Sequence, residues 1–122
     1  MVLPVPPPHP GPTPEDAAPD ADRVAELRTY GVLDTAPEAA LDELTRLAAG
    51  LFQMPVALVS LVDKHRQWFK SSVGVDFVET PREQAFCAHA IQGTDVMVVE
   101  DARQDPRFES NPLVTQVPGI RF

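Results

Sequence analysis

The chain of 122 residues is poor in cysteine and in basic side chains, with one Cys and 10 Lys and Arg against 18 Asp and Glu. A single cysteine cannot form an internal disulfide. The net charge of −8 and the lack of any basic cluster disfavour nucleic acid and anionic membrane surfaces as partners, so neither is expected. No apolar run reaches the roughly 18 residues of a membrane span, and the N-terminus lacks the pattern of a secretory signal. We therefore expect a cytoplasmic protein with no membrane partner.

Proline is unevenly distributed along the chain. Eight of the 14 prolines fall between Pro4 and Pro19. Because proline fixes φ and lacks an amide donor, this stretch is excluded from helices and from the interior of a sheet. The sequence predicts a disordered tail over residues 1–20 and one domain over residues 21–122, which is enough chain for a single modest core.

Two helices are expected after the tail. The first runs from Asp22 to Tyr30 and stops at Gly31. The second begins near Thr35, which can form a capping box with Glu38 three residues later. Apolar residues then recur at helical spacing and form one apolar face. These residues are Leu41, Leu44, Leu47, Ala48 and Leu51.

Two strands follow, separated by a short polar turn. Residues Val56 to Asp63 are apolar on both faces, which is typical of a strand in the middle of a sheet. Residues Gln67 to Val73 contain the aromatic and β-branched side chains of a pairing strand, so the two are expected to form an antiparallel hairpin. Trp68 and Phe69 are interpreted as core residues in preference to a stacking platform.

The C-terminal half carries further signals of regular structure. Thr80, Pro81 and Glu83 predict the start of a helix that ends at Gly93. A third strand is expected over Val96 to Glu100. A short helix is then expected from Asp105 to about Val117, and the final "GIRF" resembles the first residues of another strand.

The only cysteine, Cys87, lies two residues before His89 in the predicted helix. At about 100° per residue, the two side chains lie about 160° apart around a helix, so they cannot form a Cys–His dyad on it. Cys87 joins an apolar arc with Phe86, Ala90 and Ile91. Cys87 is therefore interpreted as a small buried hydrophobe and His89 as a polar anchor beside it, the alternative being that one of them faces a cavity.

Other chemistry-bearing residues do not combine into a recognised site. Asp63, His65 and Asp101 lack the spacing of a metal site, so no metal is expected. The six glycines are scattered, which excludes a phosphate-cradling loop. Asp101 either pairs with Arg103 in a loop or points into a pocket.

Three blocks of sequence together resemble the GAF domains found near the N-termini of bacterial sensor histidine kinases and diguanylate cyclases. They are "YGVLDTAPEAALDELTRLAAGLFQMPVALVSLVDKHRQWFKSSVG", "ETPREQAFCAHAIQG" and "VMVVEDARQDPRFESNPLV", and the resemblance covers about Arg23 to Phe122. It implies an α+β fold with an antiparallel sheet flanked by helices, and a ligand cavity between the sheet and the helix that holds Cys87. The residues that the resemblance places nearest that cavity are Phe69, Ser71, Phe86, Cys87, His89 and Asp101.

The resemblance implies a non-catalytic sensory domain that controls a fused or separate kinase or cyclase, and the N-terminal helices are expected to form a homodimer. A small-molecule ligand is implied, but no ligand or cofactor is identified. Bilin-binding relatives typically attach the pigment through a cysteine directly followed by histidine, whereas Ala88 intervenes here. Relatives that reduce free methionine sulfoxide usually need a resolving cysteine, which this chain lacks. A photoreceptor and a reductase are kept as alternatives.

The chain stops at Phe122, where such GAF domains continue through further strands and a closing helix. The resemblance therefore predicts a partial GAF domain, incomplete at its C-terminal end. Those further strands normally pair with the strand at Val56 to Asp63, which would otherwise have an unpaired apolar edge. Either another chain supplies them or the sequence is a gene fragment without a function of its own.

Overall fold

The computed structural model describes residues 17–116. The chain divides into two compact units, with the boundary between Glu83 and Gln84. The predicted tail up to residue 16 and the predicted strand at the C-terminus lie outside the described residues.

The first unit begins with helix α1, Ala17–Thr29. It starts earlier than the expected Asp22, so Asp20 belongs to this helix and not to the predicted tail. It ends as predicted, because Gly31 adopts a φ of +60° and its amide donates to the carbonyl of Arg28 at 3.2 Å.

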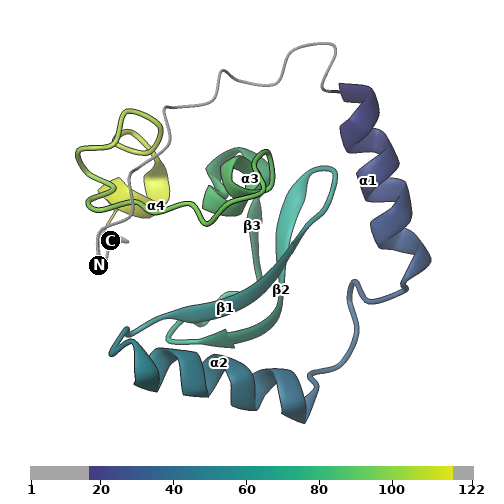
Figure 1. Ribbon diagram of the computed structural model, residues 1–122, viewed down its shortest axis with the longest axis horizontal. Coiled ribbons are helices and arrows are strands. Elements are labelled where there is room, and N and C mark those ends of the chain that lie inside the picture. Colours follow the sequence, from purple (N-terminus) through teal and green to yellow (C-terminus); the bar gives the residue numbers. More distant parts are fainter. Residues whose placement is uncertain (1–16, 117–122) are drawn as a thin grey trace. The chain divides into compact units, whose positions relative to one another are not determined.

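Helix α2, Ala39–Leu51, packs against strands β1, Ala57–Val62, and β2, Arg66–Val73 (Figure 1). Its alanine and leucine content favours helix. The capping-box prediction is wrong, since Glu38 is the N-cap residue and no side chain caps the helix. The hydroxyl of Thr35 instead donates to the carbonyl of Val32.

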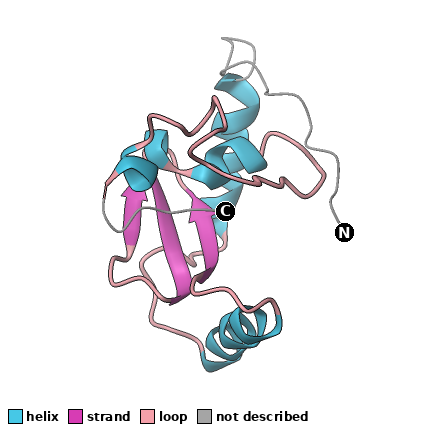
Figure 2. Ribbon diagram, turned by 90° about the vertical axis from the view of Figure 1, so that its left-hand side faces the viewer, coloured by secondary structure: helices cyan, strands magenta, loops and turns pink. Residues whose placement is uncertain are grey.

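The predicted hairpin is confirmed. Strands β1 and β2 pair antiparallel, and β3, Glu79–Pro81, pairs antiparallel with β2, so the order is β1-β2-β3. The strands lie side by side in one sheet (Figure 2). Among the described strands, β2 is the central one and β1 lies at an edge, so β1 is not central as its pattern predicts but has the unpaired edge expected of a partial domain. The side-chain pattern of β1 shows that both of its faces are apolar. Whether β1 is a central or an edge strand depends instead on which strands pair with it.

A β-bulge interrupts the pairing of β1 with β2. Val59 pairs with Ser71 and Ser60 pairs with Phe69, which leaves Lys70 as the extra residue. Strict alternation would place Phe69 and Ser71 on the same face of the sheet. The bulge breaks this alternation and allows consecutive side chains, Lys70 and Ser71, to reach α2 and the segment before it.

The second unit contains little regular structure. A 3₁₀ turn, η1, covers Arg82–Gln84 at the unit boundary, and helix α3 covers only Phe86–Ala90. Helix α4, Pro112–Thr115, is capped by Asn111, whose side chain accepts from the amide of Leu113. The unit's core is a cluster of buried side chains from the loop and α4. Its members are Ala102, Phe108 and Val114, with Phe86, Met97 and Val99 packed against them.

Three sequence predictions for the C-terminal half are wrong. Thr80 lies in β3 instead of capping a helix, and α3 is much shorter than the predicted helix up to Gly93. Residues 96–100 form no strand, and turns occupy the segment around Asp105 before α4 begins. A β-branched run becomes a strand only where another strand pairs with it, and this requirement cannot be read from the run alone.

Candidate functional site

The six residues predicted to surround a ligand cavity divide between the two units. Phe69 and Ser71 lie on β2 in the first unit. The remaining residues lie in the second unit, where Phe86, Cys87 and His89 belong to α3 and Asp101 to the loop that follows.

Ser71 is buried and its hydroxyl is engaged by α2. It donates to Oδ1 of Asp42 at 2.6 Å and lies 2.8 Å from the hydroxyl of Thr45. Thr45 is itself buried in α2 and bonds to the carbonyls of Leu41 and Asp42. This polar group fixes α2 to β2, so Ser71 supports the position of the helix on the sheet.

Lys70 makes a second connection from β2 to the segment before α2. Its side chain is only 3% exposed, and Nζ donates to Oγ1 of Thr35 and the carbonyl of Ala36, both at 2.6 Å. Oε2 of Glu38 lies 3.0 Å from the same ammonium. A buried ammonium is tolerated only when oxygen atoms surround it, and here three oxygens do so. This role cannot be predicted from the local sequence, because it depends on the bulge.

Phe69 lies at the bulge and is buried. Its ring packs against Phe77, with ring centroids 5.7 Å apart and planes tilted by 49°. Its amide donates to the carbonyl of Val78 at 2.9 Å. The interpretation of Phe69 as a core residue therefore agrees with its environment in the first unit.

Phe86 contributes to the aromatic core of the second unit. Its ring stacks on Phe108 with a centroid distance of 4.1 Å and an interplanar angle of 9°. His89 approaches the same ring edge-on at 5.1 Å, and the guanidinium of Arg107 lies 5.2 Å from its centroid. The imidazole of His89 thus packs beside the core, as expected for a polar anchor.

Cys87 is half-buried on α3 and forms no disulfide. The helix is a single short segment, so the angular argument from the sequence applies to Cys87 and His89 within it. Their side chains do not share a helix face, which disfavours a dyad.

Asp101 pairs with Arg103, as one of the two sequence alternatives predicted. Oδ1 of Asp101 accepts from the amide and Nε of Arg103, and Oδ2 accepts from Nη2 at 2.7 Å. Asp105 and Arg107 repeat this arrangement four residues later, with Nη2 to Oδ2 at 2.6 Å. The sequence reading missed the second pair, although the repeated Asp-X-Arg spacing in "DARQDPR" was a visible signal.

The two pairs differ in exposure. Arg103 is more than half exposed, whereas the side chains of Asp105 and Arg107 are 13% and 7% exposed. Hydrogen bonding from Arg107 holds the pKa of Asp105 below its usual value despite the opposing effect of burial. The second pair is therefore structural, since it allows two charges to be buried beside Phe108.

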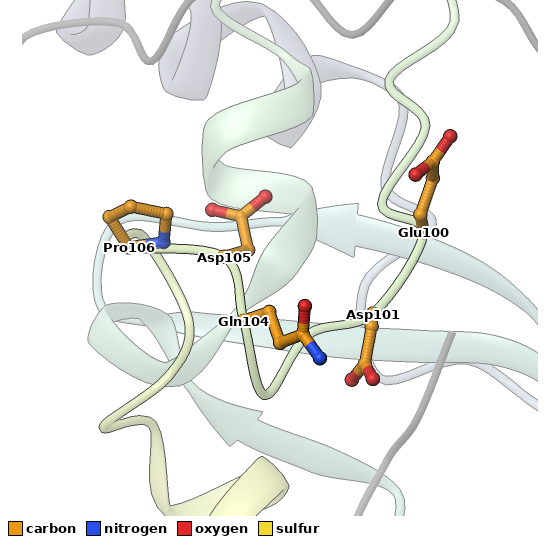
Figure 3. A pocket seen from close by; sticks show the side chains of 5 residues that line it. All are labelled: Glu100, Asp101, Gln104, Asp105 and Pro106. Carbon is orange, nitrogen blue, oxygen red and sulfur yellow. The ribbon is translucent and has the colours of Figure 1, made fainter.

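An open pocket of about 290 Å³ lies along this loop (Figure 3). It is lined by Glu100, Asp101, Gln104, Asp105 and Pro106. Three carboxylates disfavour an anionic ligand, and arginines already neutralise two of them. Within residues 17–116, no three His, Cys, Asp or Glu side chains are grouped so as to hold a metal ion.

A network of charges joins α1 to the turn between β1 and β2, and the sequence reading missed it. Arg66 contacts Asp34, Asp63 and Glu79, and Arg28 also reaches Asp63. Burial opposes ionisation of Asp63. Hydrogen bonds from the Lys64 amide and from both arginines outweigh burial and lower its pKa.

Comparisons with known proteins cover most of the chain. The model of the GAF domain family matches residues 36–122. A cyclic di-GMP phosphodiesterase of Pseudomonas aeruginosa is 43% identical over 111 residues, which cover 91% of this chain and 18% of that protein. The chain thus spans less than a fifth of the length of this curated relative. Among residues 17–116, no helix has the length and apolar character needed to cross a membrane.

Proposed function

The chain belongs to the GAF domain family, and from this we propose that it is a sensory and regulatory module of bacterial signal transduction without catalysis of its own. The family match over residues 36–122 is the observation that carries the proposal. GAF domains are generally regulatory, and the similar Pseudomonas protein is a signalling enzyme much longer than this chain. The proposal retains the cytoplasmic location expected from the sequence.

The output that we propose is an enzyme of cyclic di-GMP turnover, in the same polypeptide or in a partner. The name of the relative favours a phosphodiesterase. The kinase or cyclase expected from the sequence is the other form of output. The module would act by binding a small molecule, or by associating with a second copy, more favourably in one state of the output than in the other.

An exposed apolar surface on α2 supports association with a second copy. Leu44, Leu47 and Leu51 lie on one side of this helix and are 55%, 64% and 70% exposed. Leu41, Thr45 and Ala48 are more buried, on the side that packs against the sheet. We call the three exposed leucines the α2 stripe. A self-complementary contact between two such stripes would bury the leucines of both copies.

The functional test uses the protein that carries this chain, measured for hydrolysis and synthesis of cyclic di-GMP. Leu47→Asp should change the rate of one of these reactions several-fold, because it places a charge in the stripe. Val96→Asp, which changes a 73% exposed valine in the second unit, is the matched control and should leave the rate unchanged. Unchanged turnover in the Leu47 variant would contradict regulation through a second copy, and turnover by this chain alone would contradict a module without catalysis of its own.

The alternatives kept from the sequence have separate tests. A photoreceptor predicts covalently attached visible absorbance after co-expression with a bilin supply, and we expect none because Ala88 separates Cys87 from His89. A reductase predicts rapid thiol labelling of Cys87 in the native protein. We expect slow labelling, since the thiol is half-buried.

A further inference from the structure

Two buried polar atoms without hydrogen-bond partners lie on one row of the sheet, and a third belongs to a residue of α1 that contacts this row. In the described part of the chain, Arg23 Nη2, Gln67 Oε1 and Thr80 Oγ1 are buried without such a partner. Gln67 pairs with Val62 on one side and with Thr80 on the other. Arg23 lies on α1 and contacts the same row, because its Nη1 donates to the carbonyl of Val62 at 2.6 Å.

Gln67 and Thr80 face each other across β2 and β3, and each is 5% exposed. Directly opposed residues of an antiparallel pair place their Cβ atoms about 4.5–5.5 Å apart on the same face. One small group can therefore reach both side chains. Leaving two such atoms buried and unpaired is unfavourable, and native proteins usually satisfy such atoms with water or a ligand.

The chemistry of the two atoms restricts what can bind. The amide oxygen of Gln67 only accepts hydrogen bonds, whereas the hydroxyl of Thr80 either donates or accepts. The bound group must therefore donate at least one hydrogen bond, as an amide N–H or an alcohol O–H does. A carboxylate has no proton to donate and would repel the oxygen of Gln67.

The neighbouring residue on this face is aromatic. Phe69 follows Gln67 by two residues and precedes the extra residue of the bulge, so the two side chains lie on the same face of β2. Phe69 is buried and packs against Phe77. An apolar contact thus lies beside the polar pair, which is the usual composition of a small-molecule site.

We propose that Gln67 and Thr80 form the polar anchor of a site for a small neutral molecule that carries an amide or alcohol group. The inference rests on the proposed sensory function, because it names the ligand class of that function. A single trapped water has the same hydrogen-bonding chemistry, and the experiment separates it from a ligand.

The test uses acetamide as the probe and acetate as its control, because acetate has a similar shape without a donor. The full chain, labelled with ¹⁵N, is titrated with each and followed by NMR. Acetamide should shift the backbone amide of Thr80 and the side-chain amide of Gln67 saturably, and acetate should shift neither. Equal effects of both compounds, or no saturable shift with acetamide, would overturn the proposal.

Isosteric variants identify the anchor. Thr80→Val should weaken acetamide binding about five-fold, as expected for the loss of one hydrogen bond. Without a ligand, it should raise Tm by a few degrees, because an unpaired buried hydroxyl is removed. If Thr80→Val folds poorly, Gln67→Met takes its place, and its acetamide affinity and its Tm are measured in the same way. A lowered Tm of Thr80→Val, together with no binding of acetamide to the unsubstituted protein, would identify a trapped water and overturn the ligand site.

These outcomes are separate from those of the proposed function. If Leu47→Asp changes cyclic di-GMP turnover while acetamide fails to bind, the anchor is wrong and the regulatory role remains. If acetamide binds at Gln67 and Thr80 while the Leu47 variant changes no output, the anchor remains and regulation through the α2 stripe is wrong.

Discussion

Arg82 and Asp20, which are 62 positions apart in the chain, form an ion pair through two hydrogen bonds. Nη1 donates to Oδ2 at 2.8 Å and Nη2 donates to Oδ1 at 2.9 Å. Arg23 reaches the same carboxylate at 3.1 Å. Because Arg82 directly follows β3, this carboxylate ties α1 to the end of the sheet within the first unit.

The Asp20 pair should make stability depend on pH. Hydrogen bonding from Arg82 lowers the pKa of Asp20 to about 2. Because folding lowers this pKa, the contribution is fully present above about pH 4 and is lost as the pH falls toward the folded value. Asp20→Asn should cost about 1 kcal/mol at pH 7, since nearly a third of the side chain is exposed and solvent screens the pair.

Urea unfolding at pH 7 and pH 2.5 measures this contribution. Asp22→Asn, at an exposed position of the same helix, is the control and should change stability little. An Asp20→Asn variant that loses as much stability at pH 2.5 as at pH 7 would show that the pair does not supply the pH dependence.

The repeated Asp-X-Arg pairs should differ in their contribution to stability. Asp105→Asn should cost about 2 kcal/mol, because it leaves the buried guanidinium of Arg107 without its carboxylate. Asp101→Asn should cost much less, since Arg103 is solvated. The lowered pKa of Asp105 means that its contribution also disappears as the pH falls through the folded value. Thermal melts of the two variants test this order, and equal losses would refute it.

Substitution by alanine should change the stability of the protein in opposite directions at Gly74 and at Gly50. Gly74 has a φ of +84°, and a Cβ there would overlap the carbonyl oxygen of Pro55. Gly74→Ala should therefore cost at least about 1 kcal/mol. Gly50 lies in α2 with no atom near its Cβ position, so Gly50→Ala should stabilise by up to about 1 kcal/mol. Chemical denaturation of both variants tests the pair, and a stable Gly74 variant would contradict the close approach.

The sequence predicted those features that depend on local pattern. The hairpin of β1 and β2 and the stop of α1 at Gly31 follow from periodicity and turn residues, and both are confirmed. The Asp101–Arg103 pair was one of two alternatives because its residues are neighbours. The GAF resemblance is confirmed by the family match.

The features that the sequence missed depend on distant pairing. The strand expected at Val96 to Glu100 has the right residues but pairs with no strand among those described. The bulge at Lys70 depends on its register with β1, and it decides which side chains of β2 face α2. The local sequence does not predict the contact of Arg82 with Asp20, because the two residues are far apart in the chain. Thr80 and Pro81, just before Arg82, have the pattern of a helix start but belong to β3. The six predicted cavity residues stay predictions, although Ser71 and Phe86 already have structural contacts.

The proposed association of two copies through the α2 stripe is tested most directly by sedimentation velocity of the full chain. The chain should sediment as a dimer, and Leu47→Asp should convert it to a monomer with an unchanged circular dichroism spectrum. An exposed leucine can be replaced without loss of core packing, so the variant should fold. A monomeric wild type, or a dimer that survives Leu47→Asp, would contradict the account.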